Sequence, residues 1–222
     1  MKTIDTVIFD LDGTLLNTLD DLADSVNYAL KAFDFPIHTR DSVRKMVGNG
    51  IYVLMEKAIP DGRENPQYNP CVSLFKDYYF THMKVKTAPF DGIMPMIEQL
   101  QKHNLKLAIV SNKFDSAVKE LCQDFFTPYI TTSIGQSDSI EKKPAPDTVF
   151  MAMEQLHTSP ESSIYVGDSD VDIDTANNSG IPYISVSWGF KDREFLENYG
   201  AKQIVDTVED LQNALLSAAG IQ

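Results

Sequence analysis

Two aspartates follow the first apolar segment of the chain at a spacing of two residues. Asp10 and Asp12 are succeeded by Gly13 and Thr14. Side chains alternate along an extended strand, so this spacing places both carboxylates on one face. Gly13 permits a tight turn that a ligand can approach, and the Thr14 hydroxyl can fix the loop. A plain strand-end turn has the same composition, so the motif alone leaves both interpretations open.

Two further polar segments offer groups that bind phosphoryl oxygens. Ser111 and Asn112 follow a second apolar run, and their hydroxyl and backbone N–H groups could hold such an oxygen. Lys143 lies in a loop stiffened by Pro144 and Pro146. Taken singly, the first segment is also typical of an ordinary turn and the second of a solvated basic loop.

A fourth segment carries an unusual density of negative charge. Four acids occur within seven residues, namely Asp168, Asp170, Asp172 and Asp174. Such crowding is costly unless a cation neutralises it. The first three acids fit the start of an EF-hand loop, but Ile173 replaces its glycine and Ser179 its final glutamate, so an EF-hand is excluded. Asp170 and Asp174 could serve only to stabilise a helix N-terminus.

The elements that must position these residues alternate between strand and helix patterns. We expect buried strands at 6–11, 105–110, 129–134, 164–166 and 183–186, separated by helices at 93–102, 116–125, 148–156, 172–178 and 208–216. This order predicts an α/β fold with a doubly wound parallel sheet. Each of the four polar segments lies just after a predicted strand, and ligands bind at the carboxyl ends of the strands in an open parallel sheet. Together these residues supply the side-chain types that Mg²⁺-dependent phosphoryl transfer to a carboxylate requires.

The rhythm is interrupted between residues 17 and 87, where the pattern is helical throughout. The clearest helix begins after Thr18, which is spaced from Asp21 as in a capping box. Further helices are expected at 39–46, 52–58 and 70–82. We therefore predict a core domain of residues 1–16 and 88–222, and an inserted helical domain of residues 17–87.

The overall charge restricts the classes of partner. The chain has 222 residues, a net charge of −13 and a sequence pI near 4.6, which excludes electrostatically driven nucleic-acid binding. No apolar run approaches the roughly 20 residues that cross a bilayer, and no signal peptide is recognisable, so we expect a cytoplasmic protein that does not bind membranes. Cys71 and Cys122 indicate neither a disulfide framework nor a zinc site. The sequence leaves monomer and homodimer open.

Taken as a set, the motifs resemble the haloacid dehalogenase superfamily of aspartate-nucleophile hydrolases. The resemblance is carried, in order, by Asp10-x-Asp12-Gly13-Thr14, Ser111-Asn112, Lys143-Pro144 and Gly167-Asp168-x-x-x-Asp172. The insertion after the first motif resembles the superfamily's small helical cap. Within it, residues 43–50, followed by Leu54 and Ala58, resemble phosphoglycolate phosphatases and their near relatives.

The resemblance implies a role for each matching residue. Asp10 is the nucleophile that forms an aspartyl-phosphate, and Asp12 protonates the leaving alkoxide and then activates water. Ser111 and Lys143 bind the phosphoryl group. The Mg²⁺ ligands are Asp10, the backbone carbonyl of Asp12 and Asp168. Asp172 supports the metal through a bound water or by contact with the groups that surround the ligands. Gly13, Thr14 and Asn112 complete the phosphate site.

In the cap, Arg44, or less favourably Lys45, is expected to bind a carboxylate or a second phosphate on the substrate. Gly48 and Gly50 flank an expected turn between two cap helices, and this turn could lean towards the cleft. Arg44 could equally be a solvated helix residue. Residues 188–190 are expected to form a packing corner at the mouth of the site.

The predicted function is a Mg²⁺-dependent phosphomonoester hydrolase that acts on small phosphorylated metabolites and resembles phosphoglycolate phosphatases. A hexose-phosphate mutase of the beta-phosphoglucomutase type and a pyrophosphatase remain alternatives. A dehalogenase is disfavoured because it needs no leaving-group acid at Asp12. A non-enzymatic phospho-receiver module is disfavoured by the helical insertion and by the pairing of Asp10 and Asp12 at one strand end.

Overall fold

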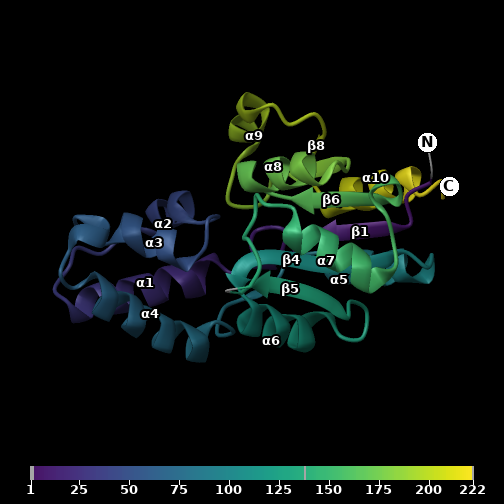
Figure 1. Cartoon of the computed structure of the whole chain (residues 1–222). Helices are drawn as coiled ribbons and strands as arrows, with labels where there is room; N and C mark the ends of the chain where they lie inside the picture. The colour runs from purple at the N-terminus through teal and green to yellow at the C-terminus, as the bar shows by residue number, and fades with distance from the viewer. Residues whose placement is uncertain (1–2, 138, 222) are drawn as a thin grey trace. The chain divides into compact units, whose positions relative to one another are not determined.

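The chain forms two compact units, shown in Figure 1. The structure is a computed structural model that describes residues 3–137 and 139–221. The core unit comprises Met1–Leu16 and Pro89–Gln222, and the helical unit comprises Asn17–Ala88. Two short strands, β2 (Leu16–Asn17) and β3 (Ala88–Pro89), pair where the chain leaves and re-enters the core unit.

The core unit is built on a six-stranded sheet in which all neighbouring strands pair in parallel. Its spatial order is β5 (Thr132–Gln136), β4 (Lys106–Phe114), β1 (Thr6–Phe9), β6 (Ser163–Gly167), β7 (Tyr183–Val186) and β8 (Ile204–Val205). The predicted α/β class with a doubly wound parallel sheet is confirmed. Only β8 lacked a predicted counterpart, because two residues are too few to show a period.

Helices cover both faces of this sheet. The helices of the core unit are α5 (Ile93–Lys102), α6 (Asp115–Phe126), α7 (Asp147–Leu156), α8 (Asp170–Ser179), α9 (Arg193–Tyr199) and α10 (Val208–Ala218). Ile8, Val110 and Tyr165 pack on one face with residues of α7 and α8. Val7 and Phe9, which alternate with Ile8 and so point to the other face, are also fully buried. Strands buried on both faces explain the continuous apolar runs of the sequence.

The strand order places the first aspartate at a topological switch point. After β1 the chain forms β4 and β5 on one side of it, and then β6, β7 and β8 on the other. Connections therefore leave the carboxyl end of β1 in opposite directions and open a crevice there. Asp10 directly follows β1, and two-residue alternation puts its side chain on the same face as Ile8.

Strand β4 is longer than predicted. We expected it to end at residue 110, but it continues to Phe114, and its register with β5 shifts between Val110 and Phe114. The shift lies where Gly135 of β5 meets the start of α6: the Gly135 N–H donates to Asp115 Oδ1 at 3.0 Å, and a Cβ there would lie 2.4 Å from the Asp115 Cα. The polar residues of the second motif thus lie in an irregular strand end rather than in a loop.

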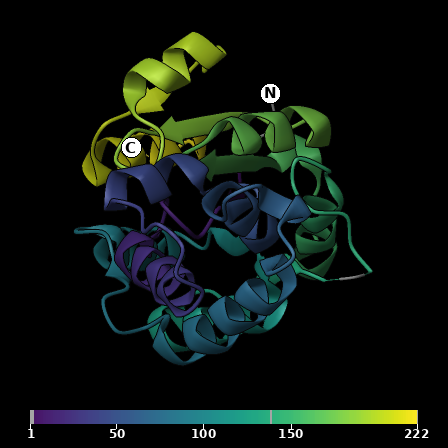
Figure 2. The same cartoon turned by 90° about the vertical axis from the view of Figure 1, so that its left-hand side faces the viewer.

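The helical unit contains α1 (Leu19–Ala32), α2 (Arg40–Met46), α3 (Ile51–Ala58) and α4 (Tyr68–His82), as the second view shows (Figure 2). Helix α1 packs against α2 and α4, and α3 packs against α2 and α4. The buried side chains include Val26, Leu30, Phe75 and Tyr79. The helical pattern expected between residues 17 and 87 is therefore observed, whereas a role for this unit as a cap stays a prediction.

The capping box expected at the start of α1 is wrong. Thr18 has a nearly helical backbone, with φ −102° and ψ 0°, and its side chain makes no capping hydrogen bond. Asp21 turns instead to the segment that leads back to the core unit. Its buried carboxylate accepts the Lys86 N–H at 3.0 Å from both oxygens and the Thr87 N–H at 2.9 Å. Asp21 therefore fastens this returning segment to α1.

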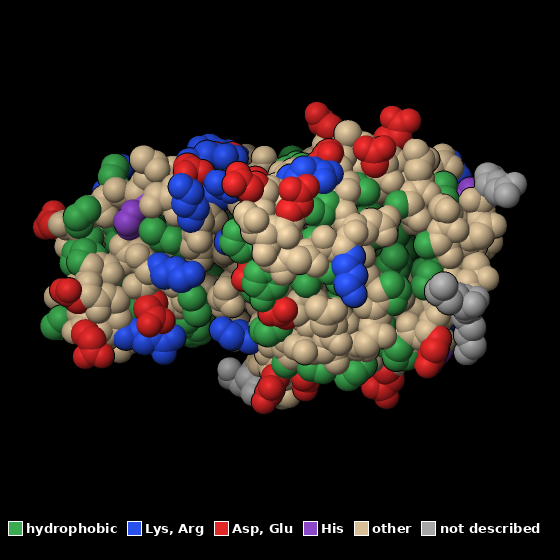
Figure 3. Space-filling model, turned by 90° about the horizontal axis from the view of Figure 1, so that it is seen from above, with side chains coloured by type: hydrophobic (Ala, Val, Ile, Leu, Met, Phe, Trp, Pro, Cys, Tyr) green, Lys and Arg blue, Asp and Glu red, His purple; other side chains and the backbone are tan. Residues whose placement is uncertain are grey.

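Acidic side chains are widely distributed on the surface (Figure 3), as the net negative charge of the sequence leads one to expect. On the face shown in Figure 3, Asp and Glu side chains are spread over both units rather than gathered in one place. None of the helices in the described part of the chain is both long and apolar enough to cross a membrane.

We expect Asp21→Ala to lower the free energy of unfolding by about 2–3 kcal/mol, because it leaves backbone N–H groups without their charged acceptor. The matched control is Asp24→Ala. Asp24 bonds the Lys86 ammonium at 2.6 Å, but both side chains are about half exposed, so its loss should cost within about 0.5 kcal/mol. Urea unfolding measures both values, and equal losses would contradict the anchoring role of Asp21.

Candidate active site

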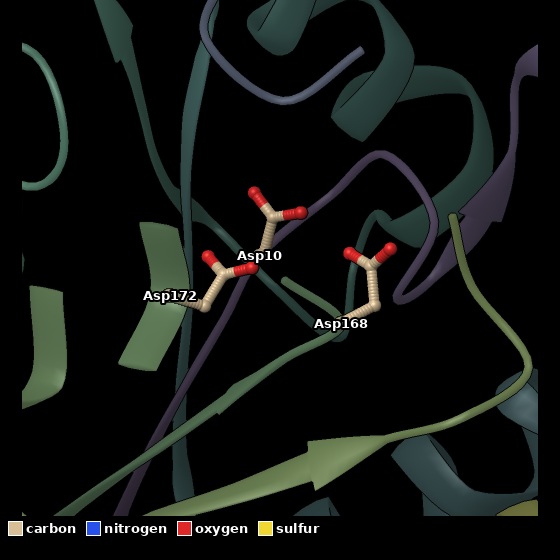
Figure 4. Close-up of side chains that lie close together, drawn as sticks. All are labelled: Asp10, Asp168 and Asp172. Carbon is tan, nitrogen blue, oxygen red and sulfur yellow. The ribbon is translucent and has the colours of Figure 1, made fainter. Parts of the chain in front are cut away.

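Three buried aspartates converge at the carboxyl end of the sheet (Figure 4). Asp10 follows β1, Asp168 follows β6, and Asp172 lies in the first turn of α8. Each side chain contributes one oxygen to a group in which all such atoms lie within 4.8 Å of one another. Strands β1 and β6 are neighbours, so their ends bring Asp10 and Asp168 together, and the immediate start of α8 adds Asp172.

Lys143 is the cation inside this cluster. Its ammonium donates to Asp10 Oδ1 at 2.6 Å and to Asp172 Oδ1 at 2.7 Å. Burial by itself lowers the pKa of Lys143, but the two carboxylates outweigh burial and hold that pKa well above its usual value. Lys143 therefore stays charged and fixes the position of Asp10.

One ammonium does not balance three carboxylates. Burial raises the pKa of Asp10 to about 7, although Lys143 opposes the rise, and repulsion from Asp172 adds to it. Burial and repulsion from Asp172 and Asp10 also raise the pKa of Asp168 well above its usual value. The site thus holds excess negative charge in a dry environment, which a bound cation would relieve.

Asp168 is held by loops from two strands. Its oxygens accept the Thr14 hydroxyl at 3.2 Å and the Phe190 N–H at 2.6 Å. A Cβ at Gly13 or Gly189 would lie 2.5 or 2.3 Å from Asp168 Oδ2, so only glycine allows these loops to approach so closely. Residues 188–190, expected only to form a packing corner, therefore also hold Asp168 in place, a role that the sequence analysis did not predict.

Asp172 connects helix α8 to the lysine. Its Oδ2 accepts the Ser169 N–H at 3.1 Å and the Ser169 hydroxyl at 2.6 Å, as part of a capping box. Its Oδ1 accepts the Lys143 ammonium and the Tyr165 hydroxyl, the latter at 3.0 Å. A direct metal bond would have to displace one of these contacts, so the geometry favours a supporting role for Asp172. Tyr165 was read from the sequence only as part of a strand.

Asp12 forms a second ion pair. Its Oδ1 accepts the Lys113 ammonium at 2.7 Å, and the Ser111 hydroxyl lies 3.4 Å from its Oδ2. Lys113 is buried and belongs to the irregular end of β4. Asn112, between them, donates its side-chain amide to the Lys143 carbonyl at 3.0 Å. Sequence reasoning missed Lys113, although it directly follows the Ser111-Asn112 motif.

The core unit thus brings together nine of the residues that the sequence nominated, namely Asp10, Asp12, Gly13, Thr14, Ser111, Asn112, Lys143, Asp168 and Asp172. Arg44 and Gly48 belong to the helical unit, where the Arg44 guanidinium donates to Asp41 at 2.9 Å. Asp174 lies outside the cluster, but its expected role at a helix N-terminus is not observed. It comes after the first turn of α8, and its carboxylate accepts the hydroxyl of Tyr199 from α9 at 2.8 Å.

Comparison with known proteins agrees with this geometry. Residues 7–186 match the family model for haloacid dehalogenase-like hydrolases. Phosphoglycolate phosphatase from Aquifex aeolicus is 32% identical over 83% of this chain and 85% of that protein, and the one from Mesorhizobium japonicum is 31% identical over 96% and 97%. A crystal structure of a candidate phosphoglycolate phosphatase from Lactobacillus delbrueckii subsp. bulgaricus superposes with a TM-score of 0.92 and 33% identity, over 96% of this chain and 99% of that one.

The chain belongs to the haloacid dehalogenase-like hydrolase family. The resemblance seen in the sequence is confirmed, as is its placement near phosphoglycolate phosphatases and in the phosphatase class of enzymes. The acid cluster also suits the divalent metal that is typical of such phosphatases, because it offers hard carboxylate oxygens at the right edge of the sheet.

We expect a divalent cation, tested as MgCl₂ against EDTA at equal ionic strength, to raise the melting temperature, because binding to the folded state alone relieves the repulsion among the acids. Asp168→Asn should abolish this shift. Asp174→Asn removes a neighbouring acid outside the cluster and should preserve it. Differential scanning fluorimetry provides the measurement, and equal shifts in the two variants would contradict this assignment of the cation site.

Proposed function

We propose that this enzyme hydrolyses phosphomonoesters in two steps through an aspartyl-phosphate on Asp10. A carboxylate oxygen of Asp10 attacks phosphorus, the bond to the ester oxygen breaks, and Asp12 gives a proton to the departing alkoxide. Asp12 then takes a proton from water, which attacks the phosphorus of the intermediate. The bond between phosphorus and the Asp10 oxygen breaks, so inorganic phosphate leaves and the Asp10 carboxylate is restored. The observation that supports this proposal is the fixed, buried contact of Asp10 with Lys143 beside Asp168.

Mg²⁺ is the proposed cofactor, and Asp10, Asp168 and the backbone carbonyl of Asp12 would hold it, with Asp172 behind them. Bound there, the ion would neutralise charge on the phosphoryl oxygens and lower the repulsion that an anionic substrate meets. The hydrogen bonds of Asp168 to Thr14 and Phe190 keep its oxygens in place for that purpose.

Lys143 and Ser111 are proposed to bind the transferring phosphoryl group. The ammonium of Lys143 already contacts the attacking carboxylate, so it can stabilise charge that moves from Asp10 to the phosphoryl oxygens. Asn112 keeps the Lys143 loop in register through the Lys143 carbonyl, and Gly13 leaves room for close approach of the backbone.

The proposed substrates are small phosphorylated metabolites, with 2-phosphoglycolate first among them because relatives over the full chain carry that activity in their names. A panel that also contains a hexose phosphate, a nucleotide and pyrophosphate distinguishes this substrate from the mutase and pyrophosphatase alternatives. Arg44 and Gly48 stay predicted contributors from the helical unit.

We expect purified enzyme with Mg²⁺ to release phosphate from 2-phosphoglycolate, and Asp10→Asn to reduce kcat by about a thousandfold or more, since an amide is a poor nucleophile. Phosphate release under saturating substrate measures this loss. Asp174→Asn, which changes an acid of α8 outside the cluster, serves as the control and should retain activity. Turnover by Asp10→Asn within about tenfold of wild type would show that Asp10 is not the nucleophile.

A further inference from the structure

Among the described residues of the core unit, two lysines are buried, and they contact different aspartates. Lys143 bonds Asp10, which is the proposed attacking group, whereas Lys113 bonds Asp12, which is the proposed proton donor to the leaving group. The two ends of a bound phosphate ester would therefore meet different ammonium groups. Lys143 serves the phosphoryl end, and Lys113 lies at the end where the alcohol departs.

Lys113 is buried in a manner that requires charged partners. Its side chain is 4% exposed, and lysine is rarely buried to this extent unless it is paired. Asp12 is somewhat more exposed, at 14%. An ammonium carries three N–H donors, and a substrate carboxylate would accept one of them in competition with the contacts that Lys113 makes in the free protein.

The reaction geometry fixes where that anion would be. To protonate the leaving oxygen, a carboxyl oxygen of Asp12 must approach it to about 2.6–3.2 Å. The Lys113 ammonium lies 2.7 Å from Asp12 Oδ1. These contacts in series keep the leaving oxygen within about 6 Å of the ammonium when Oδ1 is the donor. A carboxylate carried one carbon beyond the leaving oxygen can span this distance when it points towards Lys113.

We propose that Lys113 is the specificity-determining residue that binds a carboxylate on the leaving group. This inference rests on the proposed phosphatase function and assigns its substrate class: phosphate esters of 2-hydroxycarboxylates, of which 2-phosphoglycolate is the smallest. The core unit then takes part in recognition of the leaving group, beside the reacting atoms, in addition to the contribution predicted for Arg44. Esters of uncharged alcohols lack the second anion and are poorer substrates.

The test compares two substrates of similar size that differ in one charge, namely 2-phosphoglycolate and 2-hydroxyethyl phosphate. Wild type should prefer the carboxylated ester. Lys113→Gln should lower kcat/KM for 2-phosphoglycolate about 10- to 100-fold more than for 2-hydroxyethyl phosphate, because only the former loses a charge-assisted contact. Lys113→Arg keeps the charge and should retain most of the preference.

Lys119→Gln is the matched control, because Lys119 is an exposed lysine of the same unit that pairs with Asp115. It should leave the ratio of the two kcat/KM values unchanged. Circular dichroism and the melting temperature confirm that each variant is folded. If Lys113→Gln does not fold, product inhibition of wild type replaces it: glycolate should inhibit competitively at concentrations where ethylene glycol does not.

A merely structural role for Lys113 would disturb Asp12 and reduce both substrates by the same factor, which would overturn the inference while leaving the phosphatase proposal intact. Equal inhibition by glycolate and ethylene glycol would also overturn it. Failure of wild type to hydrolyse any phosphomonoester would instead refute the proposed function, and the inference with it.

Discussion

The organising constraint of this molecule is the burial of three carboxylates around one ammonium. Asp10, Asp168 and Asp172 repel one another in an environment that solvates them poorly, and Lys143 compensates only part of their charge. Such an arrangement persists only where the surrounding structure supports it. The strand order that brings β1 beside β6, the capping box of α8 and the glycine loops around Asp168 provide that support.

The loss of stability that comes with burying these acids is explained by the proposed reaction, which needs an oriented carboxylate and a bound cation. A carboxylate that is held against a lysine and beside further acids is oriented before a substrate arrives, and excess negative charge creates affinity for a cation. A cation bound there would offset the local negative charge that an anionic substrate otherwise meets in a chain that carries −13 as a whole. Burial that lowers stability in the free protein thus serves the proposed function.

Much of the site could be predicted from the sequence because parallel strands end at one edge of their sheet. Asp10, Lys143 and Asp168 lie far apart along the chain, but each comes near the carboxyl end of a strand, and that regularity was enough to group them. The ends of the strands could be predicted less well. Ser111 lies within β4, whose irregular end has a register shift opposite β5, and this shift lies where Gly135 closely approaches the start of α6.

Contacts across the sheet could not be predicted. Tyr165 and Lys113 belong to apolar or polar runs whose pattern gives a face but no partner, and only the fold shows that they reach Asp172 and Asp12. Thr18 illustrates the opposite error. Its spacing from Asp21 matched a local cap, whereas a buried carboxylate is satisfied by whichever N–H groups the tertiary structure supplies.

We propose above all that the carboxylate of Asp10, which accepts a hydrogen bond from Lys143, becomes covalently phosphorylated. The most direct measurement is rapid acid quenching of enzyme that is turning over 2-phosphoglycolate with Mg²⁺, followed by peptide mass spectrometry. We expect one phosphoryl group on the peptide that contains Asp10, located on Asp10 itself and lost when the substrate is exhausted. A phosphoryl group on another residue of an enzyme in steady-state turnover would contradict this proposal.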